Sequence, residues 1–138
     1  MKRIILFFTF IVLASNLLAA RDYPKWLESA AIYHIYPSSY MDSDGNGYGD
    51  LEGIRSRLDY IKNLGFNTIW ISPVFCSEFE DGGYDITDFY KIDPRFGTNT
   101  DLVNLVNDAH AKGIKVCLDL VACLLYTSPS PRDRQKSR

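Results

Sequence analysis

The feature that most constrains the fold is an alternation of continuous apolar runs with amphipathic stretches. Three apolar runs, AAIYHIY, TIWIS and KVCLDLV, occupy residues 30–36, 68–72 and 115–121. They are rich in β-branched and aromatic residues, which favours strands. Their apolar character is unbroken, which is typical of strands in a parallel sheet covered by helices.

Each of the two stretches between these strands contains a predicted helix that ends at a glycine. The first covers residues 51–64 and the second begins near Asn99 or Thr100, its expected N-cap. Gly65 and Gly113 supply the two stops. Apolar residues recur every three or four positions on one face of each helix: Leu51, Ile54, Leu58, Ile61 and Leu64, then Leu102, Val103, Leu105, Val106 and Ala109.

The order of these elements predicts an α/β fold of the βαβαβ type. Three strands cannot close a barrel, and a complete (β/α)₈ barrel takes about 250 residues, against 138 here. Residues 73–99 show no clear secondary structure. Since long loops in compact domains are commonly functional, and this one follows the carboxyl end of a strand, we expect substrate contacts there.

The loop after the first strand, DSDGNGYGD, has the composition of a cation site. Asp42, Asp44, Asn46 and Asp50 place side-chain oxygens at alternate positions, and the carbonyl of Tyr48 fills the gap. Oxygen ligands of this kind suit Ca²⁺ or Mg²⁺. The spacing resembles the start of an EF-hand, but Gly53 stands where that loop needs a bidentate Glu, and a strand precedes it. The alternative is a metal-free turn whose Asp50 caps the next helix.

Three segments together resemble the opening of the alpha-amylase family, glycoside hydrolase family 13. They are AIYHIYPSSYMDSDGNGYGDLEGIRSRLDYIKNLGFNTIWISPVF, DGGYDITDFYKIDPRFGT and GIKVCLDLVA, which lie between Trp26 and Ala122. The likeness is strongest to the oligo-1,6-glucosidase and insect maltase branch. It implies that residues 21–122 form the N-terminal part, from about the first to the third strand, of an incomplete TIM barrel.

The resemblance also implies roles for individual residues. Asp42, Asp44, Asn46, Asp50 and the Tyr48 carbonyl would hold a structural Ca²⁺ or Mg²⁺ ion. Tyr84 would stack on the terminal glucose ring, and Asp81 would bind its hydroxyls, favouring exo-cleavage of short α-glucosides. Asp119 would be the Asp of the family's first conserved region, which continues with Asn and His where this chain has Cys123 and Leu124.

The residues alone support more modest assignments. Tyr84 could be a packed loop aromatic, and Asp85 and Asp88 could be structural or capping residues. His34 is expected to be a satisfied barrel histidine rather than a ligand. His110, near the end of the second helix, is expected to face solvent.

The resemblance implies that the parent protein is an alpha-glucosidase acting on maltose- or sucrose-type sugars with retention. Retaining enzymes need two carboxylates about 5 to 5.5 Å apart, which this family carries beyond its fourth and fifth strands, so we expect these residues alone to be inactive. A different class remains open: a non-catalytic, amylase-like heavy chain of an amino-acid transporter, which binds a partner at a membrane.

The two ends differ from the middle of the chain. Residues 1–20, with a basic start, an apolar run and Ala19-Ala20, have the layout of a secretory signal peptide, so we expect secretion; a membrane anchor is the alternative. Residues 123–138 resemble the translation of a sequencing-library adapter, with a solvated tail as the alternative. A membrane association would need a C-terminal anchor beyond them.

Charge and cysteine content exclude other partners. Six of the 15 basic residues, but only one of the 17 acidic ones, fall in the two end segments, so residues 21–122 are acidic. Nucleic-acid binding is therefore not expected. Cys76, Cys117 and Cys123 have neither an even count nor metal spacing, so no disulfide framework is predicted.

Overall fold

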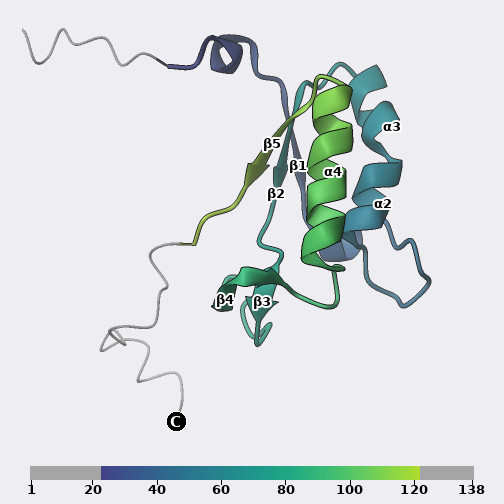
Figure 1. Cartoon of the computed structure of the whole chain (residues 1–138), viewed down its shortest axis with the longest axis vertical. Helices are drawn as coiled ribbons and strands as arrows, with labels where there is room; N and C mark the ends of the chain where they lie inside the picture. The colour runs from purple at the N-terminus through teal and green to yellow at the C-terminus, as the bar shows by residue number, and fades with distance from the viewer. Residues whose placement is uncertain (1–22, 122–138) are drawn as a thin grey trace, which may run out of the picture.

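The computed structural model describes residues 23–121 (Figure 1). The predicted signal peptide and adapter-like tail lie outside these residues. The short helical turns are η1 (Lys25–Ser29) and η2 (Pro37–Ser39). The remaining elements, in chain order, are β1 (Ile32–Ile35), α2 (Leu51–Ser56), α3 (Leu58–Asn63), β2 (Thr68–Ile71), β3 (Phe75–Ser77), β4 (Ile86–Ile92), α4 (Asn99–Ala111) and β5 (Lys115–Leu118).

The three predicted strands form one parallel sheet in the order β1-β2-β5. Ile32 lies opposite Thr68, and Thr68 lies opposite Lys115, so the strands start level with one another. The helices α2, α3 and α4 stand side by side along the sheet, and the β3–β4 hairpin lies at one end of the layers (Figure 1). This is the predicted βαβαβ arrangement.

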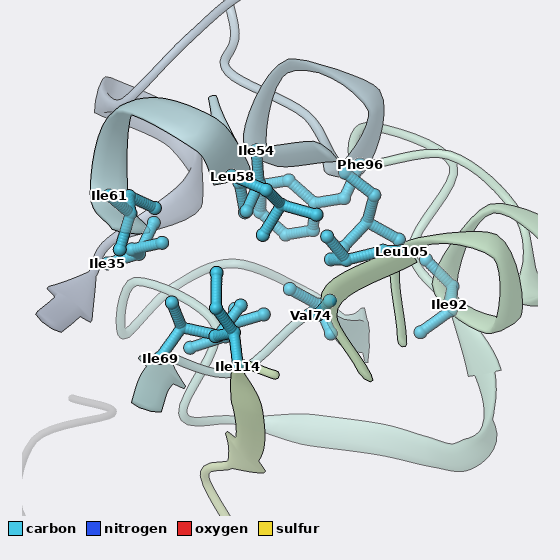
Figure 2. Packing of buried hydrophobic residues seen from close by; sticks show 13 residues of the cluster. Ile35, Ile54, Leu58, Ile61, Ile69, Val74, Ile92, Phe96, Leu105 and Ile114 are labelled. Carbon is cyan, nitrogen blue, oxygen red and sulfur yellow. The ribbon is translucent and has the colours of Figure 1, made fainter. Parts of the chain in front are cut away.

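The core lies between the sheet and the helices. Ile35 and Ile69 from the strands meet Ile54, Leu58 and Ile61 from α2 and α3, all less than 2% exposed (Figure 2). Each fully buried side chain of this size contributes roughly 1.5–3 kcal/mol by leaving water. The apolar stripes that predicted the helices therefore form the interface with the sheet.

Two helix boundaries differ from the prediction. The helix expected over residues 51–64 is broken at Arg57 (φ −104°, ψ 5°), next to Ser56, whose hydroxyl donates to the Gly53 carbonyl oxygen at 2.7 Å. Such back-bonding of a serine to its own helix competes with the regular ladder. The N-cap of α4 is Thr98, not Asn99 or Thr100, because Thr98 forms a reciprocal capping box with Asp101.

The sequence showed no clear secondary structure in residues 73–99, and this prediction was wrong. This segment contains the antiparallel hairpin of β3 and β4, whose register shifts between Phe75, Cys76 and Ser77. In β4 only the end residues Ile86 and Ile92 are buried, so the strand shows no alternating apolar pattern. An irregular, half-buried hairpin of this kind lacks the period-2 signal by which strands are recognised. Within residues 23–121, no helix combines the length and the hydropathy that crossing a bilayer would require.

Candidate active-site edge and cation loop

The carboxyl ends of the three parallel strands bring Tyr36, Ser72 and Asp119 to one edge of the sheet. Each follows the last residue of its strand. The Ser72 N–H donates to the Ile35 carbonyl oxygen at 2.9 Å, and the Asp119 N–H donates to the Ile71 carbonyl oxygen at 3.1 Å. The ladder therefore extends one residue past each strand and fixes these three side chains at the same level.

Tyr84 reaches this edge from the loop between β3 and β4. Its hydroxyl donates to Asp119 Oδ2 at 3.0 Å, although the two residues are 35 positions apart. Burial and the nearby Asp119 carboxylate raise the pKa of Tyr84 above its ordinary value of 10.0. The phenol is therefore protonated at neutral pH and is held as a donor to Asp119.

Asp81 and Tyr84 belong to one tight turn. The Tyr84 N–H donates to the Asp81 carbonyl oxygen at 3.0 Å, and the intervening Gly82 and Gly83 have φ of 61° and 97°. Residues with a Cβ rarely adopt these values, so the turn requires its glycines. The Asp81 side chain is exposed, while Tyr84 is half-buried. The predicted sugar-binding pair thus lies together, but of the two only Tyr84 makes a hydrogen bond with the sheet edge.

Tyr36 was missed by the sequence reasoning. Its hydroxyl donates to the Gly82 carbonyl oxygen at 3.4 Å, so it contacts the same turn from the first strand. The available signal was its position: an aromatic residue directly after a parallel strand lies on the edge where barrel enzymes bind substrate.

His34 is a satisfied histidine, as predicted. Its Nε2 lies 2.9 Å from Ser72 Oγ, and its ring stacks on Trp70 with centroids 4.6 Å apart. Both residues lie on the face of the sheet away from Ile35 and Ile69, where they are exposed. His110 is exposed at the end of α4, also as predicted. Asp85 and Asp88 accept the N–H groups of Glu80 and Tyr90, which is a structural role.

The loop between β1 and α2 draws its acidic residues together. Carboxylate oxygens of Asp42, Asp44 and Asp50 lie within 4.8 Å of one another. Asp42 accepts the N–H groups of Gly45 and Gly47 at 2.7 and 2.8 Å, which hold the loop in a tight curl. These amide hydrogen bonds, led by that of Gly47, lower the pKa of Asp42.

Asp50 is both a member of this cluster and the N-cap of α2. Its carboxylate is buried, accepts the Gly53 N–H at 2.6 Å, and accepts both the N–H and the hydroxyl of Ser43. The predicted capping of the next helix by Asp50 is therefore confirmed. It does not exclude a cation, since each ionised carboxylate has about four lone-pair sites.

The remaining predicted ligands lie in the same loop. Asn46 Oδ1 accepts the Tyr48 N–H at 2.8 Å, and its amide donates to Asp44 Oδ2 at 3.0 Å. The Tyr48 side chain is exposed. Three carboxylates and an amide oxygen in one curled loop form an all-oxygen set, which fits a hard cation such as Ca²⁺ or Mg²⁺.

Comparison with known proteins shows the family of this chain. Residues 34–127 match the family model described as alpha amylase, catalytic domain. The chain belongs to the alpha-amylase family. The match includes the cation loop, the Asp81–Tyr84 turn and Asp119.

Two curated relatives of this alpha-amylase family chain are named as an oligo-1,6-glucosidase and a maltase. An oligo-1,6-glucosidase of Heyndrickxia coagulans is 54% identical over 97 residues, covering 70% of this chain and 18% of the relative. Maltase A2 of Drosophila melanogaster is 52% identical over 96 residues, covering 70% and 17%. The chain thus spans less than a fifth of the length of these curated relatives.

Solved structures agree with the sequence matches. A trehalose-6-phosphate hydrolase of Bacillus licheniformis aligns with a TM-score of 0.68 at 47% identity, covering 71% of this chain and 18% of that one. The isomaltulose synthase SmuA of Protaminobacter rubrum aligns with a TM-score of 0.70 at 40% identity, covering 72% and 18%. The β1-β2-β5 sheet with its helices is accordingly the N-terminal part of a TIM barrel.

Proposed function

We propose that this segment belongs to a secreted alpha-glucosidase that hydrolyses terminal α-linked glucose of maltose- or sucrose-type sugars with retention. The observation that carries the proposal is the Asp81–Tyr84 turn, held by Tyr84 against Asp119 at the carboxyl edge of the parallel sheet. The names of the relatives, oligo-1,6-glucosidase and maltase, support the same substrate class.

In this proposal the two residues of the turn bind the terminal sugar. The exposed Asp81 carboxylate accepts hydrogen bonds from glucose hydroxyls, while the Tyr84 ring packs on the sugar face. A charged acceptor that needs matching hydroxyl groups rejects ligands that lack them. The proposed site therefore binds the terminal glucose of a sugar chain.

Hydrolysis of the glycosidic bond requires carboxyl groups in addition to these sugar-binding residues. A retaining mechanism uses a nucleophilic carboxylate and an acid/base carboxyl about 5 to 5.5 Å apart. At the described edge, Asp119 is hydrogen-bonded to Tyr84 and Asp81 lies in the substrate-binding turn. We therefore assign neither residue to the catalytic pair, and expect residues 1–138 alone to leave maltose unhydrolysed.

The proposal includes a structural Ca²⁺ or Mg²⁺ ion in the loop after β1. Asp42, Asp44, Asn46, Asp50 and the Tyr48 carbonyl would hold it. When bound, the cation supplies positive charge among three clustered carboxylates. The loop is also held by its own residues, since the Asp50 carboxylate anchors it to the first turn of α2.

A chimaera tests the proposed function. Residues 23–121 replace the segment they match in the Heyndrickxia coagulans oligo-1,6-glucosidase, which supplies the rest of the barrel. We expect release of glucose from maltose or sucrose. Removing a hydrogen bond to a charged group costs roughly 1.5–3 kcal/mol, so Asp81→Asn should lower kcat/KM about 10- to 150-fold.

The matched control is Asp88→Asn, because Asp88 belongs to the same hairpin but bonds only its local Tyr90 N–H. It should leave kcat/KM within about threefold, as surface substitutions usually change little. A correctly folded chimaera that hydrolyses no α-glucoside, or one whose activity is indifferent to Asp81, contradicts the proposal.

A further inference from the structure

A contact cluster beside the Asp81–Tyr84 turn has no part in the proposed function. It consists of Ser77, Phe79, Asp93, Arg95 and Phe96, and we call it the Arg95 cluster. Asp93 and Arg95 follow β4, whereas Ser77 is the last residue of β3, the other strand of the hairpin, and Phe79 follows it. The cluster therefore closes the base of the loop that carries Asp81 and Tyr84.

Phe79 is the strained member of this cluster. Its φ is +63°, in the left-handed region that non-glycine residues seldom occupy. Such a conformation persists only where the surroundings determine it. The surroundings here are Arg95, whose Cζ lies 4.3 Å from the Phe79 ring centroid, and Phe96, whose ring centroid lies 6.1 Å away.

Arg95 is itself held on several sides. Its Nε donates to Asp93 Oδ1 at 2.9 Å, and its Nη2 donates to the Ser77 carbonyl oxygen at 3.1 Å. Only 5% of the Asp93 side chain is exposed, and its N–H donates to the Val74 carbonyl oxygen at 2.9 Å. The guanidinium thus links a buried carboxylate, the end of β3 and the face of Phe79.

Phe79, held in this way, contacts the Asp81–Tyr84 turn at Gly83. A Cβ at Gly83 would lie 3.6 Å from Phe79 Cε2 and 3.3 Å from the Pro73 carbonyl oxygen, so the Gly83 backbone fits closely between the two. The next residue is Tyr84, whose hydroxyl bonds Asp119. A displacement of the Phe79 ring would therefore free Gly83 and shift the Tyr84 backbone.

We infer that Arg95 is a positioning residue for glucose binding, acting through the face of Phe79 and the Gly83 backbone to hold Tyr84 and Asp81. This inference rests on the proposed function for its substrate. This role requires an arginine, because the planar guanidinium bonds Asp93 and Ser77 while its face covers the Phe79 ring. A lysine ammonium can supply the charge but not the planar pair of donors.

The test uses the chimaera described above, with Arg95→Met as the main substitution. The matched control is Arg55→Met, because Arg55 is also an arginine with carboxylate partners, Glu52 and Asp108, and is 35% exposed against 32% for Arg95. Arg55 links α2 to α4, away from the hairpin. The readouts are kcat/KM for maltose and the Kd of deoxynojirimycin, a glucose-ring analogue.

We expect Arg95→Met to lower kcat/KM and weaken inhibitor binding about 10-fold, since displacement of a binding group by ~1 Å can cost up to ~100-fold. Arg55→Met should change both less than twofold. Arg95→Lys should recover part of the loss. In a Tyr84→Ala background, Arg95→Met should cause a smaller loss than in the parent chimaera, because one of the two groups that it positions is gone. Equal kinetics for Arg95→Met and Arg55→Met, or an undiminished loss in the Tyr84→Ala background, overturns the inference.

A second measurement separates this inference from the proposed function. If the unsubstituted chimaera folds but neither hydrolyses maltose nor binds deoxynojirimycin, the proposed function fails. Hydrogen exchange at the Tyr84 N–H, which bonds the Asp81 carbonyl oxygen, then reads positioning directly. Faster exchange in Arg95→Met than in Arg55→Met supports the inference, and equal exchange overturns it. Should Arg95→Met fail to fold, Phe79→Leu and Arg95→Lys give the same comparison.

Discussion

Gly53 is the position at which local propensity and packing predict opposite results. It lies inside α2, where replacing glycine by alanine ordinarily stabilises a helix by about 1 kcal/mol. A Cβ at Gly53, however, would overlap the Met41 carbonyl oxygen and lie 2.8 Å from the Met41 carbonyl carbon. Both atoms are backbone, so the helix and the loop would have to move apart.

The free energy needed to move α2 and the loop apart can be compared with the gain in helix stability from replacing glycine by alanine. Inserting a methyl group into a closely packed site typically costs 1–3 kcal/mol. We therefore expect Gly53→Ala to lower the free energy of unfolding of the chimaera by a net amount of about 0–2 kcal/mol. Met41 adjoins Asp42, and the Gly53 N–H donates to Asp50, so the same shift separates two of the proposed ligands. The rise in Tm on adding Ca²⁺ should shrink as well.

Urea unfolding measures the first effect, and thermal melts with EDTA, Ca²⁺ or Mg²⁺ measure the second. Glu52→Ala is the control, because Glu52 is the exposed neighbour on the same helix and its ion pair with Arg55 is a surface one. It should change stability by less than about 0.5 kcal/mol and leave the cation response intact. A Gly53→Ala variant that is more stable, with the same cation response, would refute the packing argument, and a parent without any cation response would refute the proposed metal site.

Three further predictions concern α4 and its N-cap and can be tested in the same chimaera. Leu105→Ala should lower the free energy of unfolding by about 2–5 kcal/mol in urea titrations, since Leu105 is fully buried, and a loss below 1 kcal/mol would contradict the packing of α4 on the sheet. Thr98→Ala should cost about 1 kcal/mol by removing the N-cap. Hydrogen bonds from Thr98 hold the pKa of Asp101 below its ordinary value of 3.8. This carboxylate therefore stabilises the fold above pH 3.8 and loses that effect as the pH falls through its folded pKa. The stability difference between parent and Asp101→Ala, followed from pH 6 downward, should vanish in that acidic range, and a difference that grew there would have the wrong sign.

The parts of the fold that could be predicted from the sequence are those whose signal is local and periodic. The stripe from Leu51 to Ile61 faces the sheet, and the three apolar runs are the three parallel strands. The break at Arg57 could not be predicted, because it does not alter the spacing of the buried residues. The β3–β4 hairpin was missed because its shifted register destroys the alternation on which strand prediction depends.

The two candidate sites differ in the same way. The cation loop is contiguous, so the spacing of Asp42, Asp44 and Asn46 already placed their oxygens together, and the structure adds the second role of Asp50 as an N-cap. The proposed sugar-binding edge joins residues from separate strands. That Asp119 lies level with Ser72 follows from the strand register, whereas its bond to Tyr84 depends on the path of the hairpin.

The path of the β3–β4 hairpin depends in turn on contacts that no local sequence pattern predicts. Phe79 carries a left-handed backbone although it is not a glycine, and the residue that covers its ring, Arg95, lies on the other arm of the hairpin. Phe79 lies outside the segments that carry the family resemblance, and Arg95 lies in one of them but at no spacing that would place it against the Phe79 ring. The shape of a sugar-binding loop can therefore differ between family members that share the same Asp-x-Gly-Tyr turn, because the contacts that hold the turn lie outside it. The Arg95 cluster is where we expect such differences to affect glucose affinity.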